Sequence, residues 1–338
     1  MAEITTGEIR DFLDKIQGQE ISLSDLRAEF HILPETKSFD GVRNIMHQLA
    51  KQNIVKPVGR RQGIFKVVKE VKPVPLFSIV REKIPPFPLI FPRYDDTDIE
   101  MDFSEYIVVR EGDLITLAGR KNKSKTLMCI NFAAVNVDKR PILMGNEYTK
   151  LVNDIYVPDQ RFLNRLQNID NVEWVDEDGN DKVTLLPVKG DYAEHIVPNR
   201  LNIIDWINLD ANQLYDISKV MEDIKSNLGR GVAIVALQKG KGAEDGRGGQ
   251  FTKDFTDCEL LLDGWDGNDD ALLTIGTVKE KTKPIMGKTY IFSNWNGAKI
   301  TNFREVVKCH TCWGKGWKKV GNGSAPCDNC GKTGYVDL

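Results

Sequence analysis

The chain has 338 residues, of which 41% are hydrophobic and 28% charged, and its formal net charge is −3. This composition is that of a soluble globular protein, and the length leaves room for about two or three domains. No apolar run is long enough to span a membrane, and the polar, acidic start does not resemble a signal peptide. We therefore expect a cytoplasmic protein without a membrane partner.

Charge is unevenly distributed near the N-terminus. Residues 1–36 carry 3 basic and 8 acidic side chains, whereas residues 37–69 carry 8 basic and 1 acidic. This asymmetry indicates a local anionic partner rather than a protein that is basic throughout.

Residues 1–70 are expected to form three helices followed by a basic hairpin. The spacing of apolar residues predicts helices over 5–17, 24–30 and 38–52, with Ser24 as the cap of the second. Two alternating apolar strands then flank a turn at residues 59–63. This order resembles a winged helix, which binds duplex DNA or, in the alternative, only other proteins. The expected DNA contacts are Arg43, His47, Lys51, Arg60 and Arg61.

Residues 71–94 are expected to form an extended linker. Six prolines lie between positions 73 and 92, a density that excludes a helix or a central strand. Apolar residues are interspersed among them. They predict that the linker packs either on a neighbouring subunit or along its own domain, and the sequence leaves both arrangements open.

The core, residues 95–303, alternates predicted strands and helices, as an α/β fold with a mostly parallel sheet requires. A strand at 114–118, a loop at 119–126 and a helix at 127–135 follow the order of a phosphate-binding P-loop. The pattern Gly-x-x-x-x-Gly-Lys-Ser/Thr is present, with Ser124 in place of the second glycine. The alternative is a lysine-rich surface loop.

In this P-loop, Lys125 would bridge the β- and γ-phosphates of ATP, and Thr126 would hold Mg²⁺. Backbone N–H groups would surround the β-phosphate at the positive end of the helix. The residues expected to cradle the nucleotide are Gly119, Arg120, Lys121, Asn122, Lys123, Ser124, Lys125 and Thr126.

Three polar residues at predicted strand ends are expected to complete the site. Glu147 follows a strand at 141–144 and would polarise the attacking water, unless it is an ordinary solvated glutamate. Asp205 ends an apolar strand and would order the Mg²⁺ shell through water, beside Thr126. Gln238 follows the strand at 231–237 and would sense the γ-phosphate.

The glycine-rich segment 239–254 is expected to be a flexible loop. It carries Lys239, Lys241 and Arg247, which suit contact with a polyanion and a change of order with nucleotide state. The alternative is a disordered, solvated loop. Strands at 271–278 and 289–292 are then expected to close the sheet.

Residues 304–338 are expected to form a zinc ribbon. Cys309-x-x-Cys312 and Cys327-x-x-Cys330 are separated by fourteen residues, so four thiolates can surround Zn²⁺ tetrahedrally. Beside a nucleotide-binding core, this spacing favours intracellular zinc over disulfides. The aromatic residues Trp313, Trp317 and Tyr335 are expected to cover the site. Lysines in the ribbon suit nucleic acid or a partner protein, and the alternative is a purely structural role.

Residues 105–295 resemble the RecA-like ATPases and, among them, the DnaB-type replicative helicases. The matching stretches are DLITLAGRKNKSKT, the strand end at Asn146-Glu147, IIDWINLD, and VALQKG with the GRGG loop. The resemblance implies a hexameric ring or a filament that hydrolyses ATP between neighbouring subunits while gripping single-stranded DNA. The zinc tail has a local likeness to half of a DnaJ-type zinc domain.

Two departures from the helicase pattern affect the expected function. The finger motif Lys-x-Arg is Lys279-x-Lys281 here, a lysine pair closer to RecA recombinases, and either lysine could supply the cation to a neighbour's γ-phosphate. The helical N-terminal domain is replaced by the winged helix. We expect an ATP-dependent DNA motor, a helicase of phage or mobile-element replication that acts in the host cytoplasm if phage-encoded. The alternatives are a recombinase or DNA-repair ATPase without unwinding, or a nucleotide-switched DNA-binding regulator.

Overall fold

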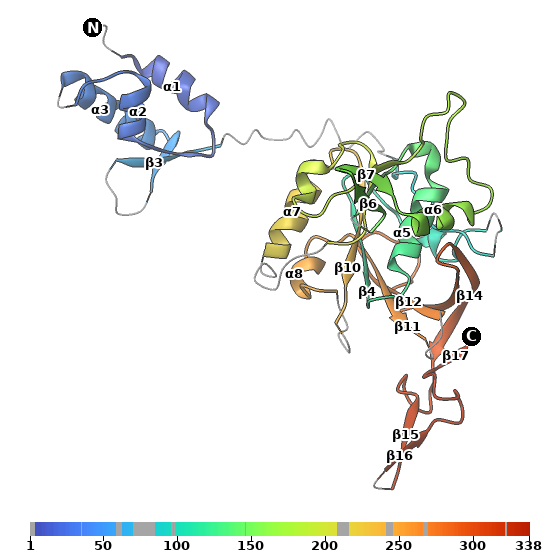
Figure 1. Ribbon diagram of the computed structural model, residues 1–338. Helices are drawn as coiled ribbons and strands as arrows, with labels where there is room; N and C mark the ends of the chain where they lie inside the picture. Colours follow the sequence, from blue (N-terminus) through green and yellow to red (C-terminus); the bar gives the residue numbers. More distant parts are fainter. Residues whose placement is uncertain are drawn as a thin grey trace. The chain divides into compact units, whose positions relative to one another are not determined.

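The computed structural model describes residues 4–34, 36–58, 63–69, 85–95, 97, 99–145, 147–207, 216–240, 246–265, 270–321 and 323–338. The chain divides into two compact units, Met1–Lys83 and Ile84–Leu338 (Figure 1). Within the described ranges, no helix has the length and apolar character needed to cross a membrane.

The described part of the first unit consists of three helices and a three-stranded antiparallel sheet with the order β1-β3-β2. Its apolar helix faces pack together with Phe65 in one core. The elements are α1 (Thr6–Lys15), β1 (Glu20–Ser22), α2 (Leu23–Glu29), α3 (Lys37–Lys51), β2 (Val55–Pro57) and β3 (Ile64–Val67).

Ser22, not Ser24, caps α2. The Ser22 hydroxyl accepts the Asp25 N–H at 3.1 Å, and the Asp25 carboxylate accepts the Ser22 N–H at 2.8 Å. This reciprocal capping box satisfies two donors at once, which a cap at Ser24 without such a partner does not do.

The extended segment 85–95 packs along its own unit. Asn136 holds the backbone of Ile90, because its side chain accepts the Ile90 N–H at 3.0 Å and donates to the Ile90 carbonyl at 2.7 Å. Phe91 is buried against Phe132, with ring centroids 5.6 Å apart. The described end of the predicted linker therefore adopts the intramolecular arrangement of the two that the sequence leaves open.

The second unit is built on a sheet of ten described strands in the order β17-β14-β13-β12-β11-β4-β10-β9-β5-β8. The neighbours from β11 to β8 are parallel, and those from β11 to β17 are antiparallel. The parallel strands are β4 (Leu114–Gly119), β5 (Ile142–Met144), β8 (Thr184–Leu186), β9 (Leu201–Ile204), β10 (Val232–Gln238) and β11 (Cys258–Gly264). The antiparallel strands are β12 (Asp270–Val278), β13 (Thr289–Trp295), β14 (Lys299–Lys308) and β17 (Tyr335–Asp337).

Helices cover both faces of the parallel half (Figure 1). Ile115 and Leu117 of β4 join the core cluster that contains α5 (Lys125–Val135), whereas Leu114 and Ala118 join the cluster of α7 (Ile217–Asn227). Side chains alternate between the faces of a strand, so β4 has to be apolar on both. The sequence correctly predicts a mixed α/β fold with this parallel sheet.

The remaining elements are short. Thr149–Val152 (β6) and Ile155–Pro158 (β7) form a two-stranded hairpin, which is followed by α6 (Gln160–Gln167). The others are α8 (Gln250–Lys253), the ribbon strands β15 (Trp317–Val320) and β16 (Gly323–Pro326), and the 3₁₀ turns Ser104–Tyr106, Val137–Lys139 and Tyr192–His195.

Candidate functional site

The loop that joins β4 to α5 lines a cavity of about 490 Å³. Its other walls come from the segments that follow β5 and β9, from the C-terminal ends of β10 and β13, and from α6. The carboxyl ends of parallel strands share one edge of a sheet, so residues far apart in sequence reach the same cavity. The lining residues are Lys121, Asn122, Lys123, Ser124, Lys125, Thr126, Leu127, Glu147, Arg165, Trp206, Gln238, Asn294 and Gly297.

Ser124 is the N-cap residue of α5 and has a left-handed backbone, with φ 56°. A non-glycine residue in this conformation costs roughly 1–2 kcal/mol. Its side chain makes no capping hydrogen bond with any described residue. The first N–H groups of α5 therefore have no side-chain cap, and they form the positive helix end at which anions bind.

Lys125 is only 8% exposed, and its ammonium group donates to the carbonyls of Gly119 and Arg120, each at 2.9 Å. Burial lowers the pKa of Lys125, and the nearby Asp205 carboxylate opposes this shift. A Cβ at position 119 would lie 3.1 Å from Cγ of Lys125 and 2.9 Å from Cβ of Leu262. Glycine at this position therefore leaves room for the lysine side chain.

Asp205 lies directly after β9 and is 1% exposed. Its Oδ2 accepts the Tyr148 hydroxyl at 2.6 Å, whereas Oδ1 has no hydrogen-bond partner among the described residues. Burial raises the pKa of Asp205, and hydrogen bonds from Tyr148 and Thr126 oppose that shift. An unpaired, buried carboxylate oxygen next to a threonine hydroxyl fits a hydrated Mg²⁺ ion.

Glu147 and Gln238 both follow the β4–α5 loop in sequence, and both line the cavity. The Trp206 indole donates to the Glu147 carboxylate at 3.3 Å, which orients an otherwise exposed side chain. Gln238 is the last residue of β10 and pairs with Gly119 of β4, so it lies beside the β4–α5 loop.

Sequence reasoning misses Tyr148, Arg165, Trp206 and Asn294. Arg165 lines the cavity from α6, and its guanidinium makes no hydrogen bond or ion pair with a described residue. Its Nε would lie 2.8 Å from a Cβ at Gly297. No local motif marks Arg165 and Asn294, because only the packing of α6 and β13 around the loop brings them there, whereas Tyr148 and Trp206 directly follow the predicted residues Glu147 and Asp205.

Lys279 and Lys281 lie outside the described lining of this cavity. The Lys279 ammonium is 2.8 Å from Oδ1 of Asp257, and Oδ2 of Asp257 accepts the Leu114 N–H at 2.8 Å. Leu114 begins β4, so this cluster lies at the end of the strand opposite the cavity. Lys281 is exposed and pairs through its backbone with Ile107. Neither lysine therefore lines the cavity of its own chain.

Lys239 was expected to contact DNA, but it is 6% exposed and its ammonium group is 2.7 Å from the Asp263 carboxylate. A buried, paired ammonium group does not face a polyanion. Arg247 is exposed, and its N–H donates to the Gln238 carbonyl at 2.7 Å. Lys241 lies outside the described residues.

Arg43, His47 and Lys51 are all exposed on α3. Their spacing of four residues places them along one stripe of the helix. The Arg43 guanidinium lies 3.9 Å from the Asp40 carboxylate and 5.5 Å from the centroid of the Phe39 ring. The hairpin residues Arg60 and Arg61 lie outside the described part of the chain.

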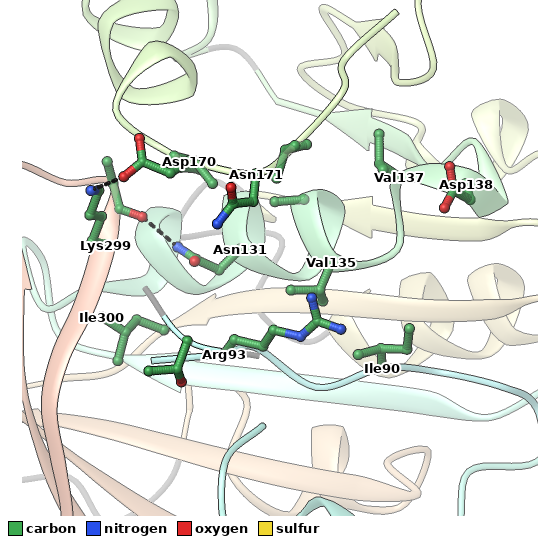
Figure 2. Close-up of a pocket in the computed structure, with 15 residues that line it drawn as sticks. Ile90, Arg93, Asn131, Val135, Val137, Asp138, Asp170, Asn171, Lys299 and Ile300 are labelled. Carbon is green, nitrogen blue, oxygen red and sulfur yellow. Dashed lines mark hydrogen bonds and ion pairs between the residues drawn. The ribbon is translucent and has the colours of Figure 1, made fainter. Parts of the chain in front are cut away.

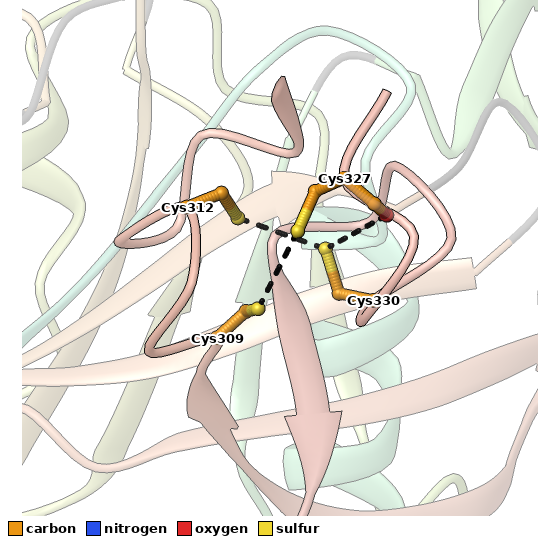
Figure 3. Close-up of side chains that lie close together, drawn as sticks. All are labelled: Cys309, Cys312, Cys327 and Cys330. Carbon is orange, nitrogen blue, oxygen red and sulfur yellow. Dashed lines mark hydrogen bonds between the residues drawn. The ribbon is translucent and has the colours of Figure 1, made fainter. Parts of the chain in front are cut away.

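The four ribbon cysteines converge, with all four sulfur atoms within 4.8 Å of one another (Figure 3). Cys309 and Cys327 are 3.8 Å apart, and Cys312 and Cys330 are 3.6 Å apart. A zinc tetrahedron with bonds of about 2.3 Å has sulfur–sulfur edges of about 3.8 Å. All six cysteines are described and are free thiols. The cluster therefore has the donor set and the spacing that zinc requires.

The expected aromatic cover over the cysteines is not observed. Trp313 is 77% exposed and Trp317 is 48% exposed, whereas Val336 is the partly buried hydrophobic residue that packs on the cluster. The Asn329 amide donates to the Cys309 sulfur at 3.2 Å and, together with backbone N–H donors of Cys312 and Thr311, lowers the pKa of this thiol to about 5. Such donors stabilise the thiolate form that binds metal.

A second cavity, of about 240 Å³, lies beside the C-terminal half of α5 (Figure 2). Two of its polar groups are paired, because the Lys299 ammonium lies 2.6 Å from Asp170 and the Asn131 amide donates to the Ala298 carbonyl at 2.8 Å. None of the residues predicted from sequence for a functional site lines it. We interpret it as a packing gap between the 85–95 segment and α5.

No protein-family model matches the chain, and no curated protein sequence matches it. Among solved structures, it is similar to the RadB recombinase, with 12% identity, a TM-score of 0.40, and coverage of 57% of this chain and 91% of that one. It is also similar to a KaiC-like protein from the hyperthermophilic archaeon Pyrococcus horikoshii, with 13% identity, a TM-score of 0.41, and coverage of 62% and 99%. Likeness at this level assigns no family to the chain.

Proposed function

We propose that the chain is a RecA-like ATPase that hydrolyses ATP in the cavity at the start of α5 and couples hydrolysis to DNA binding. The observation that carries this proposal is the meeting of Lys125, Thr126 and Glu147 in one cavity, with buried Asp205 in contact with Thr126. These are a phosphate-binding cation, a metal-binding pair and a carboxylate for water, which are the parts that phosphoryl transfer to water needs.

ATP would enter with its phosphates at the N-terminus of α5. The Lys125 ammonium would exchange its two carbonyl partners, Gly119 and Arg120, for oxygens of the β- and γ-phosphates. Thr126 and Asp205 would hold Mg²⁺, which neutralises charge on the phosphates when bound. The energetic gain comes from replacing water around the phosphates by fixed donors in a partly buried site.

Glu147 would accept a proton from the water that attacks the γ-phosphorus. Its carboxylate lies at the cavity wall and receives one hydrogen bond, from the Trp206 indole. This bond fixes its direction while leaving acceptor capacity for a water molecule. Arg165, which faces the same cavity from α6, would add positive charge near the leaving or transferred phosphate.

Gln238 would contact the γ-phosphate and transmit its presence or absence to residues 240–249. The next residue, Lys239, is held by Asp263 of β11, and the Lys123 side chain lies against Gly264, since a Cβ there would be 2.6 Å from Lys123 Cε. The end of β11 thus contacts both the β4–α5 loop and the residue that follows β10. We assign Lys239 to the positioning of this segment rather than to DNA contact.

The assembled form would be a homo-oligomer, a hexameric ring or a filament, in which Lys281 of one subunit serves the cavity of the next. Within its own subunit Lys281 lies at the other end of the sheet, so the role requires a neighbour. Single-stranded DNA would bind near the 240–249 segment, and duplex DNA along α3 of the first unit. Deleting residues 1–70 should then lower the affinity for duplex DNA and leave basal ATP turnover unchanged.

Helicase activity is the specific function that we favour, with a recombinase or repair ATPase and a nucleotide-switched regulator as the other candidates. Strand displacement separates a helicase from the other two. Stimulation of ATP turnover by single-stranded but not duplex DNA separates both motor classes from a regulator.

The proposal is tested by ATP turnover of Lys125→Ala, with Lys150→Ala on the exposed strand β6 as the control. Loss of the phosphate-binding ammonium should reduce turnover by about 100-fold or more, as removal of one electrostatic donor does in other enzymes. The control should match the wild type, and both variants should retain the far-UV spectrum. Normal turnover by a folded Lys125→Ala protein would remove this cavity as the ATP site.

A further inference from the structure

The zinc ribbon consists of two halves with equivalent backbone contacts. The Gly316 N–H donates to the Cys312 sulfur at 3.2 Å, and the Gly334 N–H donates to the Cys330 sulfur at 3.2 Å. The Cys309 N–H reaches the Gly334 carbonyl at 2.8 Å, and the Cys327 N–H reaches the Gly316 carbonyl at 2.9 Å. Each position in one half therefore has a counterpart eighteen residues away in the other.

The position after the second cysteine of each half has a left-handed backbone. It is Trp313 in the first half, with φ 54°, and Gly331 in the second half, with φ 56°. Glycine adopts this conformation without steric cost, whereas a bulky residue there is a conformational outlier. The fold of the ribbon thus favours glycine at this position, and the first half has tryptophan in its place.

Burial does not account for Trp313. Its side chain is 77% exposed, so it gains little from the hydrophobic effect. A large aromatic ring that is exposed and sits on an unfavourable backbone contributes nothing evident to folding. An outlier of this kind points to a role in binding.

A second pair of equivalent positions, Trp317 and Tyr335, differs between the halves in the same way. Tyr335 of the second half packs against Trp265 of the core, with ring centroids 5.8 Å apart, and lies in β17, which joins the main sheet. Its counterpart, Trp317, is 48% exposed, and the Lys332 ammonium lies 6.0 Å from its ring. The second half attaches the ribbon to the core, whereas the first half exposes its aromatic residues to solvent.

The exposed tryptophans lie in a basic segment. Residues 308–332 contain five lysines and one carboxylate, Asp328, which pairs with Lys318 at 2.6 Å. The other four lysines have no carboxylate partner within the described ranges. The Lys308 side chain lies beside Gly314, the residue after Trp313, because a Cβ at Gly314 would be 3.4 Å from it. Basic side chains therefore lie at Trp317, where Lys332 is over the ring, and next to the residue that follows Trp313.

We propose that Trp313 and Trp317, with Lys308, Lys315, Lys319 and Lys332, form a site for single-stranded nucleic acid. Unpaired bases would stack on the two indoles, and the lysines would contact the phosphates. A duplex keeps its bases stacked internally, so it cannot use the indole faces, and an apolar peptide would leave the lysines without partners. The site does not depend on the ATPase proposal, since it uses no residue of the nucleotide cavity.

Photocrosslinking of full-length, zinc-loaded protein tests the site directly. A single-stranded oligonucleotide that contains 5-iodouracil should crosslink to Trp313 or Trp317, as mapped by mass spectrometry of the digested adduct. The same oligonucleotide in a duplex should give no crosslink there. Crosslinks confined to the core or the first unit would overturn the proposal, and so would equal crosslinking of the duplex.

Affinity measurements separate binding from a structural role. Trp313→Gly copies the second half of the ribbon, so it should keep its zinc and melt at the same or a higher temperature. In combination with Trp317→Ala it should weaken binding of single-stranded DNA about tenfold or more, the effect expected from the loss of stacking. Trp295→Ala, which removes a partly exposed tryptophan of β13, is the control and should bind normally.

Unchanged affinity of the double variant would overturn the site. Loss of zinc or a lower melting temperature in Trp313→Gly would show that Trp313 is structural cover and would equally overturn it. A Lys125→Ala protein should still give the tryptophan crosslinks, so failure of the ATPase proposal can be told from failure of this one.

Discussion

At the scale of single residues, the candidate site depends on two buried opposite charges, Lys125 and Asp205. Burial lowers the pKa of the lysine and raises that of the aspartate, and each group opposes the shift of the other. Neither charge is neutralised by a direct ion pair that the structure records, because Lys125 is held by carbonyls and Asp205 by Tyr148. Bound phosphate and Mg²⁺ would supply the missing partners.

Arg165 should be needed for turnover and much less for binding. In Arg165→Ala, the guanidinium that faces the cavity is lost, so kcat should fall by about tenfold or more if it stabilises charge on the transferred phosphate. Arg161, exposed one turn earlier on α6, provides the matched control. Steady-state kinetics and nucleotide titration of both variants make the comparison. A loss of kcat in Arg161→Ala of the same size would show that α6 as a whole, not this side chain, matters.

The sequence predicts the residues of the site that lie in one local segment, and it misses those that tertiary packing supplies. Residues 119–126 are recognisable because their spacing follows from the loop itself. Arg165 and Asn294 carry no such signal, because α6 and β13 reach the cavity only through the packing of the sheet. The prediction for Lys239 fails for a different reason. Its basic, glycine-rich surroundings suggest an exposed side chain, whereas it forms an ion pair with Asp263 of β11.

At the scale of elements, the sheet around the site is only partly predictable. The strands with a long apolar run and a clear polar end, β4, β9 and β10, are recognisable from sequence. β11 is not predicted, although it lies directly beside β4. It follows the glycine-rich segment after only a short helix, and its apolar run, residues 260–262, is too short to separate a strand from a helix.

The start of β11 also explains how the sheet is fixed at the end away from the cavity. Asp257 is buried there and contacts three elements, through the Leu114 N–H, the Lys225 ammonium of α7 and the Lys279 ammonium after β12. Burial by itself would raise the pKa of Asp257. The hydrogen bonds from Lys225 and Lys279 outweigh that effect and hold the pKa below its ordinary value.

Asp257→Asn should destabilise the second unit by about 1.5–3 kcal/mol at neutral pH, the usual worth of hydrogen bonds to a charged group. Because the folded pKa is lowered, the wild-type advantage is present above the ordinary aspartate pKa of about 4 and is lost as the pH falls through the lower, folded value. Urea unfolding at a series of pH values measures it. Asp254→Asn, an exposed carboxylate nearby, should cost little at any pH. A stability difference for Asp257→Asn that stays constant into acid would contradict the charged pairing.

At the scale of the whole molecule, the proposed ATP turnover requires more than one subunit. The cavity of a chain contains Glu147 and Arg165, but Lys279 and Lys281 lie at the opposite end of its sheet. Lys279 is already paired with Asp257, so Lys281 is the better candidate for contact with a neighbour's nucleotide. The folding of one chain positions these side chains, whereas a contact between subunits leaves no local pattern in the sequence.

Mixing two inactive variants tests contact across the boundary. Lys281→Ala lacks the cation that it would offer to a neighbour, and Glu147→Gln lacks the carboxylate of its own cavity. Each alone should turn over ATP slowly. In mixtures, some boundaries combine an intact Glu147 with an intact Lys281, so activity should rise above that of either variant. If confirmed assemblies show no recovery at any mixing ratio, Lys281 does not act across the boundary.

The central claim, that ATP is hydrolysed in this cavity with Glu147 as the base, is tested most directly by single-turnover hydrolysis of radiolabelled ATP by Glu147→Gln. The account predicts that the variant binds ATP with Mg²⁺ as tightly as the wild type and cleaves it about 100-fold or more slowly, because the amide cannot accept the proton. Glu177→Gln, an exposed carboxylate outside the cavity, should behave as the wild type. A Glu147→Gln protein that cleaves bound ATP at the wild-type rate would contradict the account.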